Sequence, residues 1–267
     1  MKTLLFFLFL LFNPIYSQNS FQRIISLSPY ITEEIYLLKA DKSLIACTTY
    51  CKVKNKERVG SVMGVDIEKI VGFKPDLVLA TPLSNKAQIE KLKGLGINVV
   101  LFSYPKNFSS LCEQFMELGR LLGKEKEAER VVKVSRKRVG EVKKKTKERP
   151  KSRVIVQIGA NPLWVSGKNA MINDFIELGG GINIGPDEDS PYSKEEIIKD
   201  NPDVIIIMEM GIIGENEKKN WERIKVINAG KNKRIYIVDA YSLGSPTPAS
   251  FPKTLKRIVK ILHPDID

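Results

Sequence analysis

The chain contains two copies of one sequence pattern, and this internal repeat constrains the fold more than any other feature. Residues 65–80 read VDIEKIVGFKPDLVLA, and residues 192–207 read YSKEEIIKDNPDVIII. Each copy predicts a short helix that begins at a capping residue, a Pro-Asp turn and then an apolar strand. The matched pairs are Asp66 and Ser193, Glu68 and Glu195, Ile70 and Ile197, Pro75 and Pro202, and Asp76 and Asp203. Such a repeat predicts two related lobes.

The apolar strands also indicate the kind of sheet in each lobe. A strand that is apolar at every position is buried on both faces, which is typical of a parallel sheet covered by helices. Further strand-like runs occur at 23–27, 98–102, 153–157 and 234–238, and helical stretches alternate with them. We therefore predict an α/β fold of two Rossmann-like lobes with central parallel-type sheets and a ligand cleft between the lobes.

A single long helix is predicted to join the lobes. Its apolar residues fall at helical spacing: Ala128, Val131, Val132, Val139 and Val142. We expect this helix to run from Lys124 until Pro150 stops it. The predicted organisation is thus an N-terminal lobe over 18–123, a linker helix over 124–150 and a C-terminal lobe over 151–267.

The positive charge of the chain is concentrated on the predicted linker. The formal net charge is +12, and residues 133–153 alone hold eleven Lys or Arg and two Glu. This concentration argues against a general surface for nucleic acid, and we expect no nucleic-acid partner. A solvated helix face is the favoured interpretation of the basic segment, and attachment to an anionic lipid surface is the alternative.

The first residues have the form of a secretory signal. Residues 1–17 read MKTLLFFLFLLFNPIYS, in which one Lys precedes an apolar run and Ser17 offers a small residue for cleavage. No Cys follows the apolar run, so we expect no lipid-anchored mature end. We predict a protein that is exported and periplasmic after cleavage. The alternative is an interfacial anchor that is never cut.

Two scarce residue types exclude several kinds of enzyme. The only histidine is His263, close to the end of the sequence, which argues against His-based zinc sites and Ser-His-Asp triads. The three cysteines are Cys47, Cys51 and Cys112. A Cys47–Cys51 bridge is one possibility, and Cys112 suits a small buried apolar side chain. We predict no catalytic residue, no metal site and no resident cofactor. A two-lobed enzyme remains the less favoured alternative.

Several longer segments resemble a known family. They are RIISLSP at 23–29, TTYC at 48–51, VGSVMGVDIEKIVGFKPDLVLAT at 59–81 and GANPLWVSGKNAMINDFIELGGGINI at 159–184. These segments resemble the helical-linker periplasmic binding proteins of ABC importers, which take up vitamin B12, iron-siderophores and haem. The similarity is greatest to the cobalamin-binding members. The resemblance implies a monomeric receptor that binds a corrinoid, or a ferric siderophore or haem, and delivers it to permease subunits in the membrane.

The expected ligand contacts lie in loops that follow strands, because ligands of open α/β sheets bind outside the carboxyl ends of the strands. In the N-terminal lobe they are Pro29, Tyr30, Tyr50, Cys51, Met63, Gly64 and Pro82. In the C-terminal lobe they are Asn161, Pro162, Trp164, Glu209, Tyr241 and Ser242. The aromatic residues among them would offer wide contact area to a large flat ligand. Coordination of a ligand's iron or cobalt by Tyr50 or Cys51 is a further possibility.

The repeat supplies one matched glutamate in each lobe. Glu68 and Glu195 both occupy the second position of a predicted helix. The resemblance implies that these two carboxylates dock onto arginines of the permease. The alternative is a purely local role, in which each carboxylate stabilises the positive end of its own helix.

Overall fold

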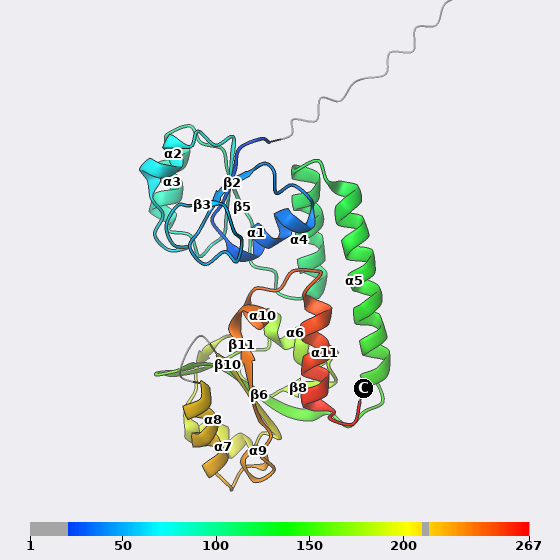
Figure 1. Ribbon diagram of the computed structural model, residues 1–267. Coiled ribbons are helices and arrows are strands. Elements are labelled where there is room, and N and C mark those ends of the chain that lie inside the picture. Colours follow the sequence, from blue (N-terminus) through cyan, green and yellow to red (C-terminus); the bar gives the residue numbers. More distant parts are fainter. Residues whose placement is uncertain (1–20, 210–213, 267) are drawn as a thin grey trace, which may run out of the picture.

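The computed structural model describes residues 21–209 and 214–266, and the predicted signal segment lies outside this range. Two lobes lie one above the other, and the long helix α5 (Glu125–Thr146) runs along both of them (Figure 1). The N-terminal lobe is built before α5 and the C-terminal lobe after it. The predicted order of lobe, helix and lobe is confirmed.

The N-terminal lobe is organised around a five-stranded sheet in which every pair of neighbours is parallel. The strand order is β3-β2-β1-β4-β5. The strands are β1 (Ile24–Ser26), β2 (Leu44–Cys47), β3 (Glu57–Arg58), β4 (Leu77–Ala80) and β5 (Val99–Leu101). The helices are α1 (Pro29–Leu37), α2 (Ile67–Gly72), α3 (Lys86–Gly94) and α4 (Phe108–Leu121). All of β4 is buried, as its continuous apolar run predicts.

The C-terminal lobe holds a mixed sheet with the order β11-β10-β6-β7-β9, and β8 pairs with β6 off this path. The strands are β6 (Ser152–Ala160), β7 (Leu163–Val165), β8 (Gly181–Asn183), β9 (Ser190–Pro191), β10 (Val204–Glu209) and β11 (Ile235–Asp239). The helices are α6 (Met171–Leu178), α7 (Lys194–Asp200), α8 (Gly214–Arg223), α9 (Asn228–Lys231), α10 (Ala240–Gly244) and α11 (Phe251–Leu262). The parallel-type prediction holds for β6, β8, β10 and β11. It misses β7, which is antiparallel to β6 because the chain reverses in a tight turn after Ala160, and β9, which pairs antiparallel with β7.

The repeat has the same local structure in both lobes. Asp66 caps α2 by accepting a hydrogen bond from the Lys69 amide at 2.9 Å, and Ser193 caps α7 by accepting one from the Glu196 amide at 3.1 Å. The Pro-Asp turns have matching roles as well. A carboxylate oxygen of Asp76 accepts from the Arg23 amide, just before β1, at 3.0 Å. One of Asp203 accepts from the Arg153 amide, early in β6, at 2.9 Å. Each turn therefore holds the start of its lobe's first strand.

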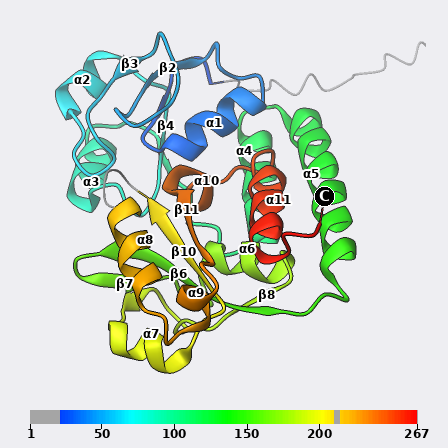
Figure 2. The same ribbon diagram turned by 60° about the horizontal axis from the view of Figure 1, so that its bottom comes forward.

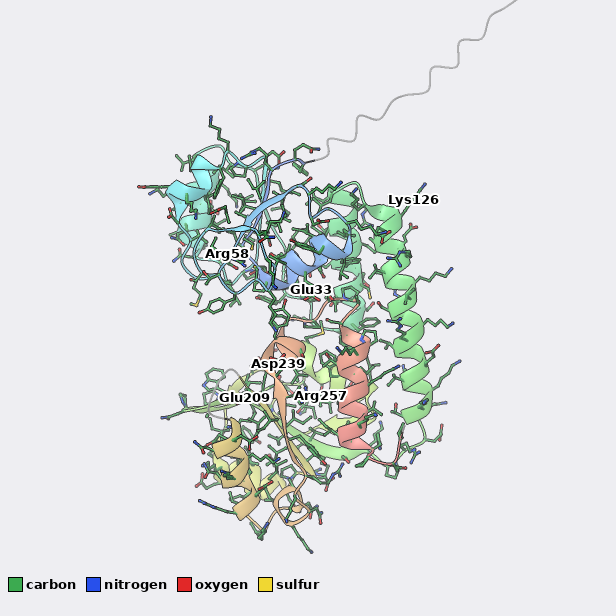
Figure 3. The ribbon with its side chains drawn as sticks, in the orientation of Figure 1. Glu33, Arg58, Lys126, Glu209, Asp239 and Arg257 are labelled. Carbon is green, nitrogen blue, oxygen red and sulfur yellow. The ribbon has the colours of Figure 1, made fainter. Side chains whose placement is uncertain are left out.

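The linker helix is shorter than predicted. All five of its expected apolar residues are buried, but α5 ends at Thr146 and not at Pro150. The Thr146 hydroxyl donates to the Leu178 carbonyl at 3.2 Å, which ties the last turn to α6. With 22 residues, α5 spans roughly 33 Å at 1.5 Å per residue. Its outer face is polar, and Lys126 points away from both lobes (Figure 3).

A shared aromatic cluster joins the lobes beside α5. Phe251 at the start of α11 lies between Phe175 of α6 and Phe108 at the start of α4, with ring centroids 4.1 and 4.6 Å away. The Phe108 amide also donates to Asp174 Oδ2 at 2.6 Å, so a carboxylate of one lobe caps a helix of the other. One hydrophobic core therefore runs through both lobes and through α5.

Candidate ligand-binding site between the lobes

The two lobes meet at the loops and helices that follow their strands. Tyr241 lies on α10, directly after β11, and Glu33 lies on α1, which follows β1. The Tyr241 hydroxyl donates to Glu33 Oε2 at 3.0 Å, although the two residues are 208 positions apart. Figure 2 shows α10 beside α1, and Figure 3 labels Glu33 at the lower edge of the upper lobe. We call this boundary the interlobe face.

A second contact at the interlobe face comes from Lys52. Its Nζ lies 3.9 Å from the centre of the Tyr241 ring, a cation–π arrangement. The Tyr241 side chain therefore touches two side chains of the other lobe. Burial raises the pKa of Tyr241, and the negative charge of Glu33 raises it further, so this hydroxyl stays protonated and can donate.

Asp239 at the end of β11 organises the turn below Tyr241. Its Oδ2 accepts from the Ser242 amide at 2.9 Å and from the Ser242 hydroxyl at 2.8 Å. Partial burial opposes ionisation of Asp239, but the hydrogen bonds from Ser242 and the charge of Lys52 hold its pKa below the usual value. The predicted ligand contact Ser242 thus lies in the first turn of α10, where its hydroxyl donates to the capping carboxylate.

Two neighbouring loops of the N-terminal lobe present exposed side chains. Tyr50 is 69% exposed and Met63 is 73% exposed. The loops are tied together where the Thr49 amide and hydroxyl both donate to the Gly60 carbonyl, at 2.9 and 3.0 Å. Gly60 has a φ of +99°, and an added Cβ would lie 2.5 Å from the Gly64 carbonyl oxygen. The tight turn at 60–65 thus depends on glycine and sets the position of Met63.

The predicted contacts of the C-terminal lobe lie on a hairpin and on β10. Asn161 and Pro162 are exposed at the turn between β6 and β7, and Trp164 is 36% exposed on β7. Glu209 is partly exposed at the end of β10 and pairs in register with Asp239 on β11. Figure 3 shows Glu209 and Asp239 on the same side of the lower lobe. The sheet edge therefore carries two adjacent carboxylates.

The structure does not bring Tyr30 to the interlobe face. Tyr30 is only 3% exposed, and its ring packs against Tyr104 with 5.8 Å between centroids. Burial raises the pKa of Tyr30, and an interaction with the Gln114 side chain opposes part of this rise. The prediction failed because the start of α1 turns Tyr30 inward, whereas Glu33, three positions later, reaches Tyr241. Pro29 is partly exposed, and Pro82 and Gly64 are exposed.

The three cysteines are free thiols, and all are buried. Cys112 is fully buried in α4, as predicted for a small apolar side chain. Cys51 is 4% exposed, so its sulfur lies beneath the interlobe face and not on it. In the described ranges 21–209 and 214–266, no group of three or more His, Cys, Asp or Glu side chains is arranged to hold a metal ion.

The two matched glutamates occupy equivalent exposed positions. Glu68 and Glu195 each lie in the first turn of their helix, α2 and α7 respectively. These helices lie at the upper and lower ends of the molecule, on the opposite side from α5 (Figure 1). Neither carboxylate has a hydrogen bond or ion pair among the described residues. The neighbouring Glu196 forms the capping box with Ser193, so the local capping role belongs to Glu196 and not to Glu195.

The sequence analysis missed three residues of the interlobe face. They are Glu33, Lys52 and Asp239, all of which contact or flank Tyr241. Lys52 directly follows the TTYC segment and Asp239 ends an expected strand, so the rule that located the loops could have included both. Glu33 carries no such signal, because its position on α1 becomes relevant only when the lobes are placed together.

Similarity to known proteins agrees with this two-lobed arrangement. Residues 24–241 match the family described as periplasmic binding protein. The chain belongs to the periplasmic binding protein family. Members of this family are binding proteins and not enzymes, and no described helix is long and apolar enough to cross a bilayer.

Particular periplasmic binding proteins resemble the chain along most of its length. An uncharacterized ABC transporter substrate-binding lipoprotein of Bacillus subtilis is 32% identical over 82% of this chain and 73% of its own. The vitamin B12-binding protein of Vibrio cholerae is 26% identical over 85% of this chain and 84% of its own. A solved structure of a possible iron-binding, periplasmic solute-binding protein from Staphylococcus epidermidis is 27% identical. It has a TM-score of 0.80 and covers 91% of this chain and 98% of its own.

Proposed function

We propose that this protein is the extracytoplasmic substrate-binding component of an ABC importer, and that it binds cobalamin or a related corrinoid between its lobes. The observation that carries the corrinoid assignment is the similarity to the vitamin B12-binding protein of Vibrio cholerae, which extends over 85% of the chain. Both lobes contribute to the interlobe face, so a ligand held there would contact two separate sets of side chains.

The exposed side chains in the loops and strands near the lobe boundary are of kinds that suit a large ligand with apolar and polar parts. Tyr50 and Trp164 are exposed aromatic residues from different lobes, and Tyr241 adds a ring with a protonated hydroxyl. Aromatic side chains supply wide contact area together with a polar end. Glu33 and Lys52 offer an acceptor and a donor, which are free to turn to the ligand once Tyr241 moves.

The alternative ligand is a ferric siderophore or haem. The similarity to the possible iron-binding protein of Staphylococcus epidermidis favours this alternative, and Tyr50 offers an exposed phenol oxygen as a donor to iron. A titration separates the two ligand classes. Purified protein is titrated with cyanocobalamin, haemin and a ferric siderophore, and binding is followed by calorimetry and absorption.

We expect saturable binding of cyanocobalamin to one site. The changes Tyr50→Ala and Trp164→Ala should each weaken binding by about tenfold, since loss of a ring contact costs on the order of 1 kcal/mol or more. Tyr36→Ala is the matched control, because Tyr36 is an exposed tyrosine that does not lie in these loops. Tight binding of haemin or siderophore in the absence of cobalamin binding would contradict the corrinoid assignment.

We also propose that Glu68 and Glu195 dock onto arginines of the permease subunits. One exposed carboxylate per lobe, in the same helical register, allows contact at two points, and pairing with arginine can be bidentate. Reversal of both charges, Glu68→Lys with Glu195→Lys, should abolish transport in vesicles containing the permease and leave ligand affinity unchanged. The control reverses one exposed glutamate in each lobe elsewhere, Glu117→Lys with Glu177→Lys. Normal transport by the Glu68/Glu195 variant would refute docking through these residues.

The last two parts of the proposed function concern removal of the leader and the oligomeric state. We propose that a leader ending at Ser17 is removed on export and that the mature chain acts as a monomer without nucleic acid or a resident cofactor. Amino-terminal sequencing of the exported protein tests the cleavage, and light scattering on a sizing column tests the monomer. An uncut chain in the membrane fraction, or a dimer at micromolar concentration, would overturn the respective statement.

A further inference from the structure

A groove between α5 and α11 has basic walls. Its volume is about 350 Å³, which is at the lower end of the range typical of small-molecule sites. Lys256 and Lys260 lie one turn apart on α11 and line one side, and Lys145 of α5 lines the other. Among the described residues that line the groove, Glu141 is the only acidic one. The groove therefore carries a net positive charge.

The floor of this groove is aliphatic. Val142 of α5 and Val259 of α11 are 4% and 5% exposed, and Ile266, beyond the end of α11, is partly exposed. The Ile266 amide donates to the His263 carbonyl at 3.1 Å, so a turn fixes the position of Ile266 beside the end of the helix. A guest that has an anionic group next to an apolar part would match both the walls and the floor.

The groove belongs to a larger basic surface made by two neighbouring helices. α5 and α11 lie side by side along the C-terminal lobe (Figures 1 and 2). Residues 133–146 contain seven Lys or Arg and one Glu, and α11 contains four Lys or Arg and no acidic residue. Like charges on adjoining helices repel one another, and a partner of opposite charge relieves that repulsion. The surface is therefore complementary to an anion.

The α11 lysines of the groove lack a counter-charge. Within the ranges 21–209 and 214–266, neither the Lys256 nor the Lys260 side chain takes part in an ion pair or a hydrogen bond. Lysines in the last turn of a helix stabilise its negative end, which would account for Lys145 and Lys260. Lys256 lies one turn earlier, so stabilisation of the helix ends does not explain the full set.

We propose that this groove binds the headgroup of an anionic phospholipid and thereby attaches the protein to a membrane surface through α5 and α11. The lipid phosphate pairs with the lysine ammonium groups, and the glycerol and first methylenes rest on Val142, Val259 and Ile266. This apolar floor favours a lipid over an acidic peptide, which has no apolar part next to its charge. The sequence of α5 alone favours a solvated face, because it does not show that lysines of α11 border the same groove.

The lipid surface is separate from the proposed permease contacts. α5 lies on the opposite side of the molecule from α2 and α7, which carry Glu68 and Glu195 (Figure 1). The inference therefore goes beyond the transport function and does not depend on which ligand is bound between the lobes. A variant that loses attachment to lipid but keeps its ligand affinity separates the two proposals.

Vesicle flotation measures the attachment directly. Exported protein, after removal of its leader, is mixed with vesicles of phosphatidylcholine alone or of equal amounts of phosphatidylcholine and phosphatidylglycerol. We expect the protein to float with the mixed vesicles and not with the neutral ones. An ionic strength of about 1 M, at which charges are screened beyond roughly 3 Å, should release it.

Three variants test the walls and the floor of the groove. Lys256→Gln with Lys260→Gln should weaken attachment by about thirtyfold, since each basic residue near an anionic surface contributes about fivefold. Lys231→Gln with Lys233→Gln is the matched control, because it removes the same charge from exposed lysines at the end of α9. The control should weaken attachment by less than about threefold. Ile266→Asn should weaken it by about fivefold at unchanged net charge, through loss of apolar contact.

The outcomes decide between a lipid site and its alternatives. The proposal is overturned if the protein floats equally with neutral vesicles. It is also overturned if both double-lysine variants weaken attachment equally, since total charge would then explain the binding. Unchanged attachment of Ile266→Asn would overturn the placement of the lipid on the apolar floor. Binding of poly-glutamate that depends on Lys256 and Lys260, without binding of mixed vesicles, would assign the groove to an acidic peptide and overturn the membrane assignment.

Discussion

Truncation of Phe251 should uncouple the two lobes. Phe251 is 0% exposed and stacks on Phe175 at 4.1 Å with an angle of 16° between the rings, while its other face meets Phe108 of the N-terminal lobe at 4.6 Å. Replacement of a buried Phe by Ala costs about 3–5 kcal/mol of unfolding free energy. For a protein of this size that corresponds to a fall in Tm of roughly 6–20 °C.

The size of the loss does not by itself identify an interlobe role, so the variant needs a matched control. Phe115 is also 0% exposed and lies on α4, within the N-terminal lobe and its packing against α5. We expect both Phe251→Ala and Phe115→Ala to lower Tm. Of these two variants, only Phe251→Ala should separate the lobes, because the Phe251 ring contacts both Phe108 of α4 and Phe175 of α6.

Calorimetry and small-angle X-ray scattering provide the readouts. We expect one unfolding transition for the unmodified protein and for Phe115→Ala, and two overlapping transitions with an increased radius of gyration for Phe251→Ala. The argument is refuted if Phe251→Ala lowers Tm by less than about 2 °C, since a filled aromatic core site cannot be emptied at so small a cost. It also fails if Phe115→Ala produces the same splitting of the transition.

Three further predictions concern a buried acid, the interlobe contact and a turn. Burial, with the charge of Glu33, raises the pKa of Glu34 well above 4.5, so the folded protein keeps a proton that the unfolded chain releases. Unfolding free energy should therefore fall as pH rises from about 4.5 through the raised pKa, by about 1.4 kcal/mol per pH unit. Glu34→Gln should abolish this fall, as measured by urea titrations at a series of pH values. The prediction is contradicted if unfolding free energy changes with pH equally in the unmodified protein and in Glu34→Gln. Tyr241→Phe should increase the radius of gyration, because Glu33 loses its donor at 3.0 Å. Tyr192→Phe, which loses a bond to Asp200 within one lobe, should not, and equal radii for both variants would count against an interlobe role. Gly60→Ala should lower stability by about 1–3 kcal/mol through its φ of +99°. Gly94→Ala, on an open helix face, should be neutral or stabilising, so equal melting temperatures would argue against strain at Gly60.

The repeat shows how far local sequence reasoning extends in this protein. The caps at Asp66 and Ser193, the buried strands β4 and β10, and the apolar stripe of α5 were all predicted correctly. Each of these features depends on residues within a few positions, through capping bonds or through the period of the helix or strand. The end of α5 lies at Thr146, four residues before the predicted stop at Pro150, where the Thr146 hydroxyl also contacts the distant Leu178 carbonyl.

The sequence by itself determined the two lobes, the helix between them and the matched glutamates, since these follow from periodicity and repetition. Only the tertiary structure decided which side chains meet at the interlobe face. It turned Tyr30 into the core, engaged Ser242 in a cap and paired Glu33 with Tyr241 from 208 positions away. The physical reason is that the direction of a side chain and its distant partners depend on how whole elements pack, and a local pattern does not contain that information.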